Sequence, residues 1–98
     1  MTARETSFEG RVQGVGFRYT CKDLAKGFDL SGFVENKPDG SVRLVLQGEF
    51  DEIEAYLHDL SEESALAHYI KGQITLPIAV DPELIGFSIR KNTKSEGL

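Results

Sequence analysis

The sequence predicts an α+β domain in which two helices cover one face of an antiparallel sheet, and three observations lead to this fold class. The chain has 98 residues, which is the size of one small domain with a single core. Hydrophobic residues make up 40% and charged residues 28%, as is typical of globular proteins. Apolar residues alternate in some segments and recur at helical spacing in others, which indicates strands and helices in turn.

The first half of the chain is expected to hold a strand, a helix and a hairpin. Residues Thr6–Val12 predict a short strand, and residues Phe17–Lys26 predict a helix that ends before a glycine. Phe28–Glu35 and Ser41–Gln47 are expected to pair as two strands, because Pro38-Asp39-Gly40 between them favours a tight turn.

The second half is expected to hold one helix and two strands. Apolar residues recur at helical spacing from Phe50 to Leu60 in an otherwise acidic segment, which predicts an amphipathic helix. Tyr69–Ile78 predicts a fourth strand, in which Pro77 suits a strand end or a sheet edge. Ile85–Arg90 predicts a last short strand. We expect residues 1–91 to form one domain and residues 92–98 a polar C-terminal tail.

The resulting order is βαββαβ with a short C-terminal strand, which predicts a ferredoxin-like two-layer sandwich. In that arrangement the first and second strands run in the same direction, with the third between them. Their C-terminal ends then lie at the same edge of the sheet. We therefore expect the loop Gln13–Arg18 and the turn at Asn36 to be neighbours in space.

Charge and cysteine content exclude several classes of function. The net charge of −5 argues against nucleic acid and anionic membranes as partners. Residues 1–26 sum to +2 and residues 44–70 to −7, so an anion should bind near the N-terminal third. The single Cys21 can form neither an internal disulfide nor a cysteine-based metal site. With no long apolar run and no signal-like N-terminus, we expect a cytoplasmic monomer.

The loop Gln13–Arg18 has two glycines in three residues and leads from a strand into a helix. Successive backbone N–H groups in such a turn can surround an anion, and the helix N-terminus adds partial positive charge. Arg18 can place its guanidinium over a bound phosphate or carboxylate. The third glycine of a dinucleotide fingerprint and the Gly-Lys-Ser/Thr of a Walker loop are absent. Taken alone, the glycines fit an ordinary tight turn about equally well.

Asn36 also has two interpretations. An asparagine in a turn usually satisfies its own backbone. The predicted topology instead places its carboxamide beside the anion loop, where it can hold a water in line with phosphorus. No other catalytic constellation is evident: His58 and His68 are expected at the surface, without metal-ligand spacing. The phenylalanines at five positions are expected in the core: Phe17, Phe28, Phe33, Phe50 and Phe87.

Two longer segments of the chain stand out, GRVQGVGFR (residues 10–18) and GFVENKPDGSV (residues 32–42). They resemble the two signature segments of the acylphosphatase family, in the family's order and separation. The resemblance is dense over residues 10–48 and returns at residues 87–90. It implies a hydrolase that converts acyl phosphates to a carboxylate and inorganic phosphate. By motif position, Arg18 is the phosphate-binding arginine and Asn36 the water-positioning asparagine.

The resemblance implies a site that needs little chemical assistance. The leaving carboxylate has a pKa of roughly 4 and needs no general acid, and the loose phosphoryl-transfer transition state demands little of a base. We therefore expect no metal and no cofactor, with inorganic phosphate or sulfate as competing anions. The catalytic residues are expected to be Arg18 and Asn36. The predicted phosphate-binding residues are Gln13, Gly14, Val15, Gly16, Phe17 and Arg18.

Two alternatives stay open. One is a catalytically weak module that binds anions or acyl phosphates on the same fold, which also occurs joined to larger proteins. The other is an RNA-binding domain with the same order of elements, but the acidic net charge and the missing aromatic–basic pattern count against it. Glu35 stands where the family often has a basic or neutral residue. Side chains alternate along a strand, so Glu35 should face away from Asn36 and modulate the site without catalysing.

Overall fold

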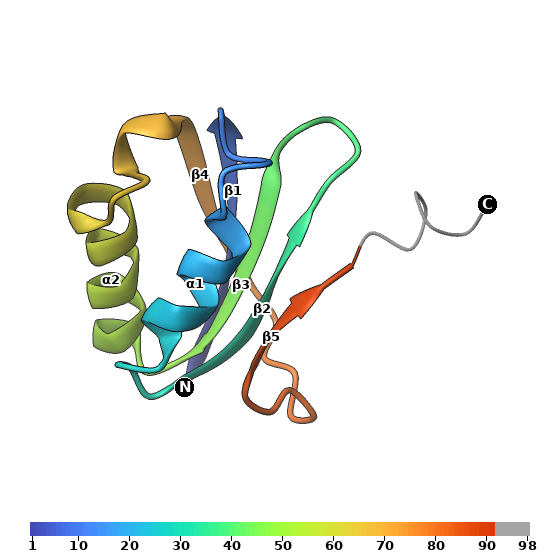
Figure 1. Cartoon of the computed structure of the whole chain (residues 1–98). Coiled ribbons are helices and arrows are strands. Elements are labelled where there is room, and N and C mark those ends of the chain that lie inside the picture. Colours follow the sequence, from blue (N-terminus) through green and yellow to red (C-terminus); the bar gives the residue numbers. More distant parts are fainter. Residues whose placement is uncertain (92–98) are drawn as a thin grey trace.

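The computed structural model describes residues 1–91 and places two helices side by side on one face of a five-stranded sheet (Figure 1). A π-helical turn (Asp59–Glu63) and a 3-10 turn (Ala67–Tyr69) follow the second helix. The predicted tail at residues 92–98 lies outside the described residues. The main elements are β1 (Thr2–Gly10), α1 (Phe17–Ala25), β2 (Leu30–Asn36), β3 (Val42–Gly48), α2 (Phe50–His58), β4 (Ile70–Ile78) and β5 (Phe87–Arg90).

The sheet has the order β4-β1-β3-β2-β5, which confirms the predicted ferredoxin-like topology. The first four strands pair antiparallel, as expected, and β5 adds a parallel pairing with β2 that makes the sheet mixed. Phe8 of β1 and Asn36 of β2 lie on opposite sides of the same β3 residue, Val42. The C-terminal ends of β1 and β2 therefore meet at one edge of the sheet, as predicted.

The core lies between the sheet and the two helices. The ring of Phe17 at the start of α1 packs on Phe8 of β1, with 5.2 Å between centroids. The Tyr56 hydroxyl of α2 donates a 2.7 Å hydrogen bond to the Cys21 carbonyl of α1 and so ties the helices together. Burial raises the pKa of the Cys21 thiol to about 12. The largest fully buried side chains are Tyr56, Phe8, Phe17, Leu44, Leu46, Ile53, Leu60, Val12, Val34, Val42, Thr6 and Cys21.

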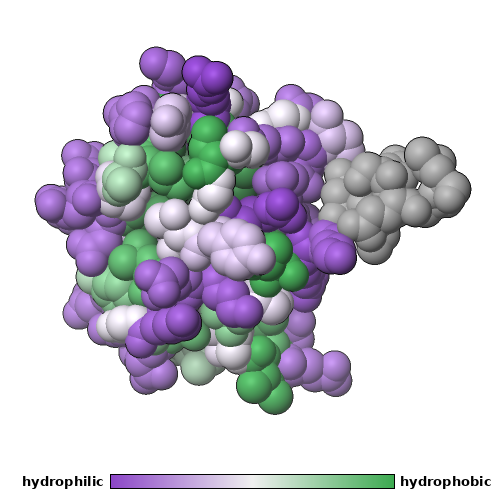
Figure 2. Space-filling view, in the orientation of Figure 1, coloured by the Kyte–Doolittle hydropathy of each residue, from purple (hydrophilic) through white to green (hydrophobic). Residues whose placement is uncertain are grey.

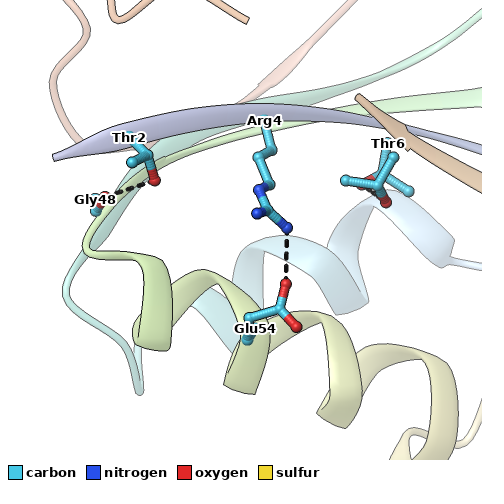
Figure 3. A network of polar contacts seen from close by, with 6 residues as sticks. Thr2, Arg4, Thr6, Gly48 and Glu54 are labelled. Carbon is cyan, nitrogen blue, oxygen red and sulfur yellow. Dashed lines mark hydrogen bonds and ion pairs between the residues drawn. The ribbon is translucent and has the colours of Figure 1, made fainter. Parts of the chain in front are cut away.

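Strand β1 begins at Thr2 and ends at Gly10, so the predicted start at Thr6 was too late. Apart from the buried Ala3, its first residues are polar and lack an apolar alternation, yet they make specific contacts (Figure 3). The Arg4 guanidinium donates to Glu54 of α2 at 2.8 Å, and the Thr6 hydroxyl lies 2.8 Å from that of Thr75. These polar contacts accompany a part of the strand that apolar periodicity alone does not predict.

Two other predictions about the core need correction. Val12 lies beyond β1 in the loop, although it is fully buried as a core residue should be. Phe50 is 47% exposed, because it begins α2 at the sheet margin and packs under the Arg4 guanidinium, 4.4 Å from its ring centroid. Phe33 is buried as expected, but on the face of the sheet without helices, where Arg90 stacks at 3.5 Å.

The two edges of the sheet differ. β4 forms one edge and carries Pro77, as expected for a proline within a strand. Residues 79–86 connect β4 to β5, which forms the opposite edge. The Gln47 carboxamide holds this connection in place: it donates to the Asp81 carbonyl at 2.9 Å and accepts from the Asp81 N–H at 2.8 Å.

On the face that carries the helices, hydrophilic residues surround small groups of hydrophobic ones (Figure 2). None of the helices within residues 1–91 has the length and apolarity to span a membrane.

Candidate active site

The loop between β1 and α1 depends on two glycines in a left-handed conformation. Gly14 has φ 77° and Gly16, the residue that caps α1, has φ 83° and ψ 17°. A Cβ at either position would meet no heavy atom within 4 Å. The glycines are therefore required by backbone conformation and not by lack of space, because other L-residues are strained there by about 1–2 kcal/mol.

This conformation leaves a set of backbone donors free. Among the hydrogen bonds of residues 1–91, the N–H groups of Gly14, Val15, Gly16 and Phe17 have no protein acceptor. They stand directly before the nine-residue helix α1, whose dipole adds partial positive charge at the same place. Free N–H groups at a helix N-terminus are suited to binding the oxygens of an anion.

A cavity of about 220 Å³ opens between this loop and the end of β2. Arg18, the second residue of α1, contributes a half-buried side chain to it, and Tyr19 stands at its rim with 76% of its surface exposed. The lining consists of Val12, Gly14, Gly16, Phe17, Arg18, Tyr19 and Asn36. The structure thus confirms that the loop and Asn36 are neighbours, as the topology predicted.

Asn36 is the last residue of β2, and its side chain points to the helix-bearing side of the sheet. Its Oδ1 atom is buried and has no hydrogen-bond partner among the described residues. The interpretation of Asn36 as a turn residue that satisfies its own backbone is therefore wrong. A buried acceptor without a partner costs about 1–3 kcal/mol. A bound water, an ion or a role in a functional site can supply the reason for such a group.

The side chain of Gln13 makes contacts that the sequence does not predict, while binding of phosphate by its backbone N–H stays a prediction. Its side-chain Nε2 donates to the backbone carbonyls of Lys37 and Ser41, both at 2.8 Å. The carboxamide therefore joins the anion loop to the β2–β3 turn and does not face the cavity. The motif drew attention to Gln13 as a loop residue, but no sequence signal identified its two acceptors across 24 and 28 residues of chain.

The β2–β3 turn is held by its own hydrogen bonds. The Asp39 carboxylate accepts from the Ser41 hydroxyl at 2.6 Å and from the Ser41 backbone N–H at 2.9 Å, as the Pro-Asp-Gly segment suggests. These two hydrogen bonds hold the pKa of Asp39 below its ordinary value. The Lys37 N–H donates to the Ser41 carbonyl at 2.9 Å and closes the hairpin next to Asn36.

Glu35 lies on the other face of the sheet, as the alternation of side chains predicts. Its carboxylate is 3.2 Å from Arg43, whose guanidinium also lies 2.8 Å from Glu5. Burial alone would lower the pKa of Arg43, but the hydrogen bonds that its guanidinium donates to these two carboxylates outweigh burial and raise it. The Glu35 charge is thus paired with the charge of Arg43, on the face of the sheet opposite the cavity.

The remaining candidate ligands lie away from the cavity. His58 and His68 are both exposed, as expected, and His68 stacks on Tyr69 with 4.1 Å between ring centroids. Within the part of the chain that the structure describes, no group of three His, Cys, Asp or Glu side chains is close enough to hold a metal ion.

Comparison with known proteins agrees with this geometry. A family profile described as Acylphosphatase matches residues 4–89. The acylphosphatase of Oceanobacillus iheyensis is 31% identical over 86 residues, which cover 88% of this chain and 94% of that protein. The acylphosphatase of Methanospirillum hungatei is 42% identical over 52 residues, which cover 53% of this chain and 57% of that protein.

Solved structures lead to the same family. The crystal structure of acylphosphatase from Bacillus subtilis aligns with a TM-score of 0.82 at 27% identity, over 92% of this chain and 99% of that one. The structure of HypF from T. kodakarensis aligns with a TM-score of 0.80 at 28% identity, over 92% of this chain but only 12% of HypF. The profile match over most of the chain, together with the full-length relative, shows that this chain belongs to the acylphosphatase family of hydrolases.

Proposed function

We propose that this acylphosphatase hydrolyses the carboxyl–phosphate bond of small acyl phosphates by direct attack of water on phosphorus. The observation that carries the proposal is that three features belong to the lining of one cavity: the loop with its free N–H groups, the Arg18 side chain and Asn36, whose buried Oδ1 has no partner among the described residues. Donors from the loop and an unsatisfied acceptor on Asn36 match the needs of an anion and an attacking water.

The phosphate would be held by the loop. Backbone N–H groups from Gln13 to Phe17 would donate to its oxygens, and the Arg18 guanidinium would pair with its charge through two parallel hydrogen bonds. As the bond to the leaving group breaks, charge spreads over the same oxygens, so donors fixed by the loop stabilise the transition state.

Asn36 would orient the nucleophile. Its Oδ1 would accept a hydrogen bond from the water and point the water's lone pair at phosphorus. The P–O bond to the acyl group breaks as the water–phosphorus bond forms, and the products are a carboxylate and inorganic phosphate. Among residues 1–91, no carboxylate or imidazole lines the cavity, so the water's proton would pass to a phosphate oxygen, as the loose transition state permits. No step of this scheme uses a metal or a cofactor.

The test is an assay of benzoyl phosphate hydrolysis with the purified chain, with and without EDTA. We expect turnover that EDTA does not change. Loss of turnover with EDTA and its recovery with Mg²⁺ or Zn²⁺ would contradict the mechanism. Arg18→Ala should abolish most of the activity. Arg11→Ala, which removes an exposed arginine from the same loop, is the matched control.

The second candidate is a module that binds phosphate or acyl phosphates with little turnover. The alignment with a small part of HypF favours it, because there the same fold is one portion of a much longer chain. Calorimetric binding of inorganic phosphate without hydrolysis of benzoyl phosphate would support this candidate over the enzyme.

A further inference from the structure

The carboxamide of Gln13 connects the two segments that form the site. Lys37, whose carbonyl accepts one of its hydrogen bonds, directly follows Asn36 in the chain. The Ser41 carbonyl accepts the second hydrogen bond from Gln13. Ser41 directly precedes Val42, which pairs with Asn36 on the neighbouring strand. The two 2.8 Å hydrogen bonds therefore hold both arms of the hairpin, at the residue pair next to Asn36 and Val42.

The position of Asn36 depends on such backbone contacts. Its Oδ1 has no protein partner in residues 1–91, so no hydrogen bond to this atom fixes where the side chain lies relative to the loop. Its location is set by where β2 ends relative to Gly14 and Gly16. In the described structure, Gln13 supplies the side-chain hydrogen bonds between the loop and the hairpin.

The acceptors of Gln13 are already engaged within the turn. The Lys37 carbonyl also accepts from the Gly40 N–H at 3.1 Å, and the Ser41 carbonyl also accepts from the Lys37 N–H at 2.9 Å. The hairpin is thus closed by its own hydrogen bonds, and Gln13 adds a second donor to each carbonyl. What Gln13 adds is the connection to the loop.

We propose that Gln13 is a positioning residue, which sets the distance between the phosphate held by the loop and the water held by Asn36. The inference rests on the proposed function and assigns the Gln13 side chain a role within it. Without this connection the loop would still offer its N–H groups and Arg18 to phosphate. The water would no longer be held in line with phosphorus, so the rate should fall more than the affinity.

The experiment compares Gln13→Met with Gln47→Met. Methionine keeps the approximate length of glutamine but donates no hydrogen bond. Gln47 is a matched control, because it also makes two hydrogen bonds to the backbone of another segment, at the opposite end of the sheet. We expect Gln13→Met to lower kcat for benzoyl phosphate by about 10-fold or more, since a misplacement of about 1 Å can cost roughly 100-fold. KM and the inhibition constant of inorganic phosphate should stay within about twofold.

The control separates positioning from a general loss of stability. Gln47→Met should lower the melting temperature at least as much, because Gln47 is buried and Gln13 half-buried, but it should leave kcat close to that of the native protein. Gln13→Glu, which keeps the shape and places a carboxylate against two carbonyls, should reduce kcat at least as strongly as Gln13→Met.

Three outcomes would overturn the inference. Equal kcat values for Gln13→Met and Gln47→Met would show that the connection does not position the water. A rise in KM and in the phosphate inhibition constant without a fall in kcat would make Gln13 a binding residue. Failure of both Gln13 variants to fold, while Gln47→Met folds, would make it a folding residue. Absence of turnover in the native protein would instead overturn the proposed function on which the inference rests.

Discussion

Replacement of Asn36 by alanine should make the protein more stable and much less active. The buried Oδ1 has no protein partner, and such a group costs about 1–3 kcal/mol in the folded state. Alanine removes that cost but also removes the contacts of the carboxamide, so we expect a net gain of about 1 kcal/mol. For a chain of this size, that gain raises the melting temperature by roughly 4–8 °C. The loss of one preorganised polar group should lower kcat by roughly 10²–10³-fold, or about 2.7–4 kcal/mol.

The assay is thermal unfolding followed by circular dichroism, paired with the initial rate of benzoyl phosphate hydrolysis. Val34→Ala is the matched control, since Val34 lies two residues earlier on the same face of β2 and is fully buried. It should lose roughly 2 kcal/mol of stability by cavity formation and retain most of its kcat. If Asn36→Ala keeps the native kcat, Asn36 has no part in the mechanism. If it loses stability as Val34→Ala does, its side chain is structural.

The other predictions concern charge and pH. Arg18→Ala should raise KM and lower kcat together, because the guanidinium contacts the phosphate charge in both the ground state and the transition state. An effect on KM alone would contradict this role. Arg11→Ala is the control. Inorganic phosphate and sulfate should inhibit competitively, and non-competitive inhibition would place the anion elsewhere. Glu35→Gln should raise kcat/KM slightly at low ionic strength, an effect that shrinks with added salt, whereas a collapse of kcat would make Glu35 a general base. Burial raises the pKa of Cys21 from 9.0 to about 12 and that of Tyr56 above its ordinary 10.0. The native state therefore holds these protons more tightly, so the contribution of these two groups to the free energy of unfolding should be constant below about pH 9 and fall above it. In Cys21→Ala the fall between about pH 9 and 12 should be smaller, as urea titrations can measure.

The order of elements could be predicted because each element carries a local pattern. Alternating apolar residues, the apolar spacing of α2 and the Pro-Asp-Gly turn are properties of short stretches of chain. The start of β1 could not be predicted, because Thr2 and Arg4 are polar and are held by partners far away in sequence, Gly48 and Glu54. Polar contacts between distant residues leave no periodic signal.

The site could be predicted in its location and only partly in its detail. The two glycines require positive φ for reasons of local sterics, and strand order alone brings their loop to Asn36. The direction of the Gln13 side chain could not be predicted, since it depends on the carbonyls that the folded hairpin presents to it. That Asn36 lacks a partner could also not be read from sequence, because burial of one atom is a property of the packed structure.

The parallel pairing of β5 with β2 has a consequence for how often the site opens. Because β5 covers the outer side of β2, the strand that ends in Asn36 lies inside the sheet and is not an edge. Phe87 of β5 also packs near Tyr56, with 6.4 Å between ring centroids, which joins the pairing to the helical layer. Backbone amides of an interior strand exchange with solvent only in rare, large openings, whereas those of an edge strand exchange by local fraying. The amides of β2 should therefore exchange as slowly as those of β3. Because the pairing with β5 extends to Glu35, fraying of β2 should be confined to Asn36 itself.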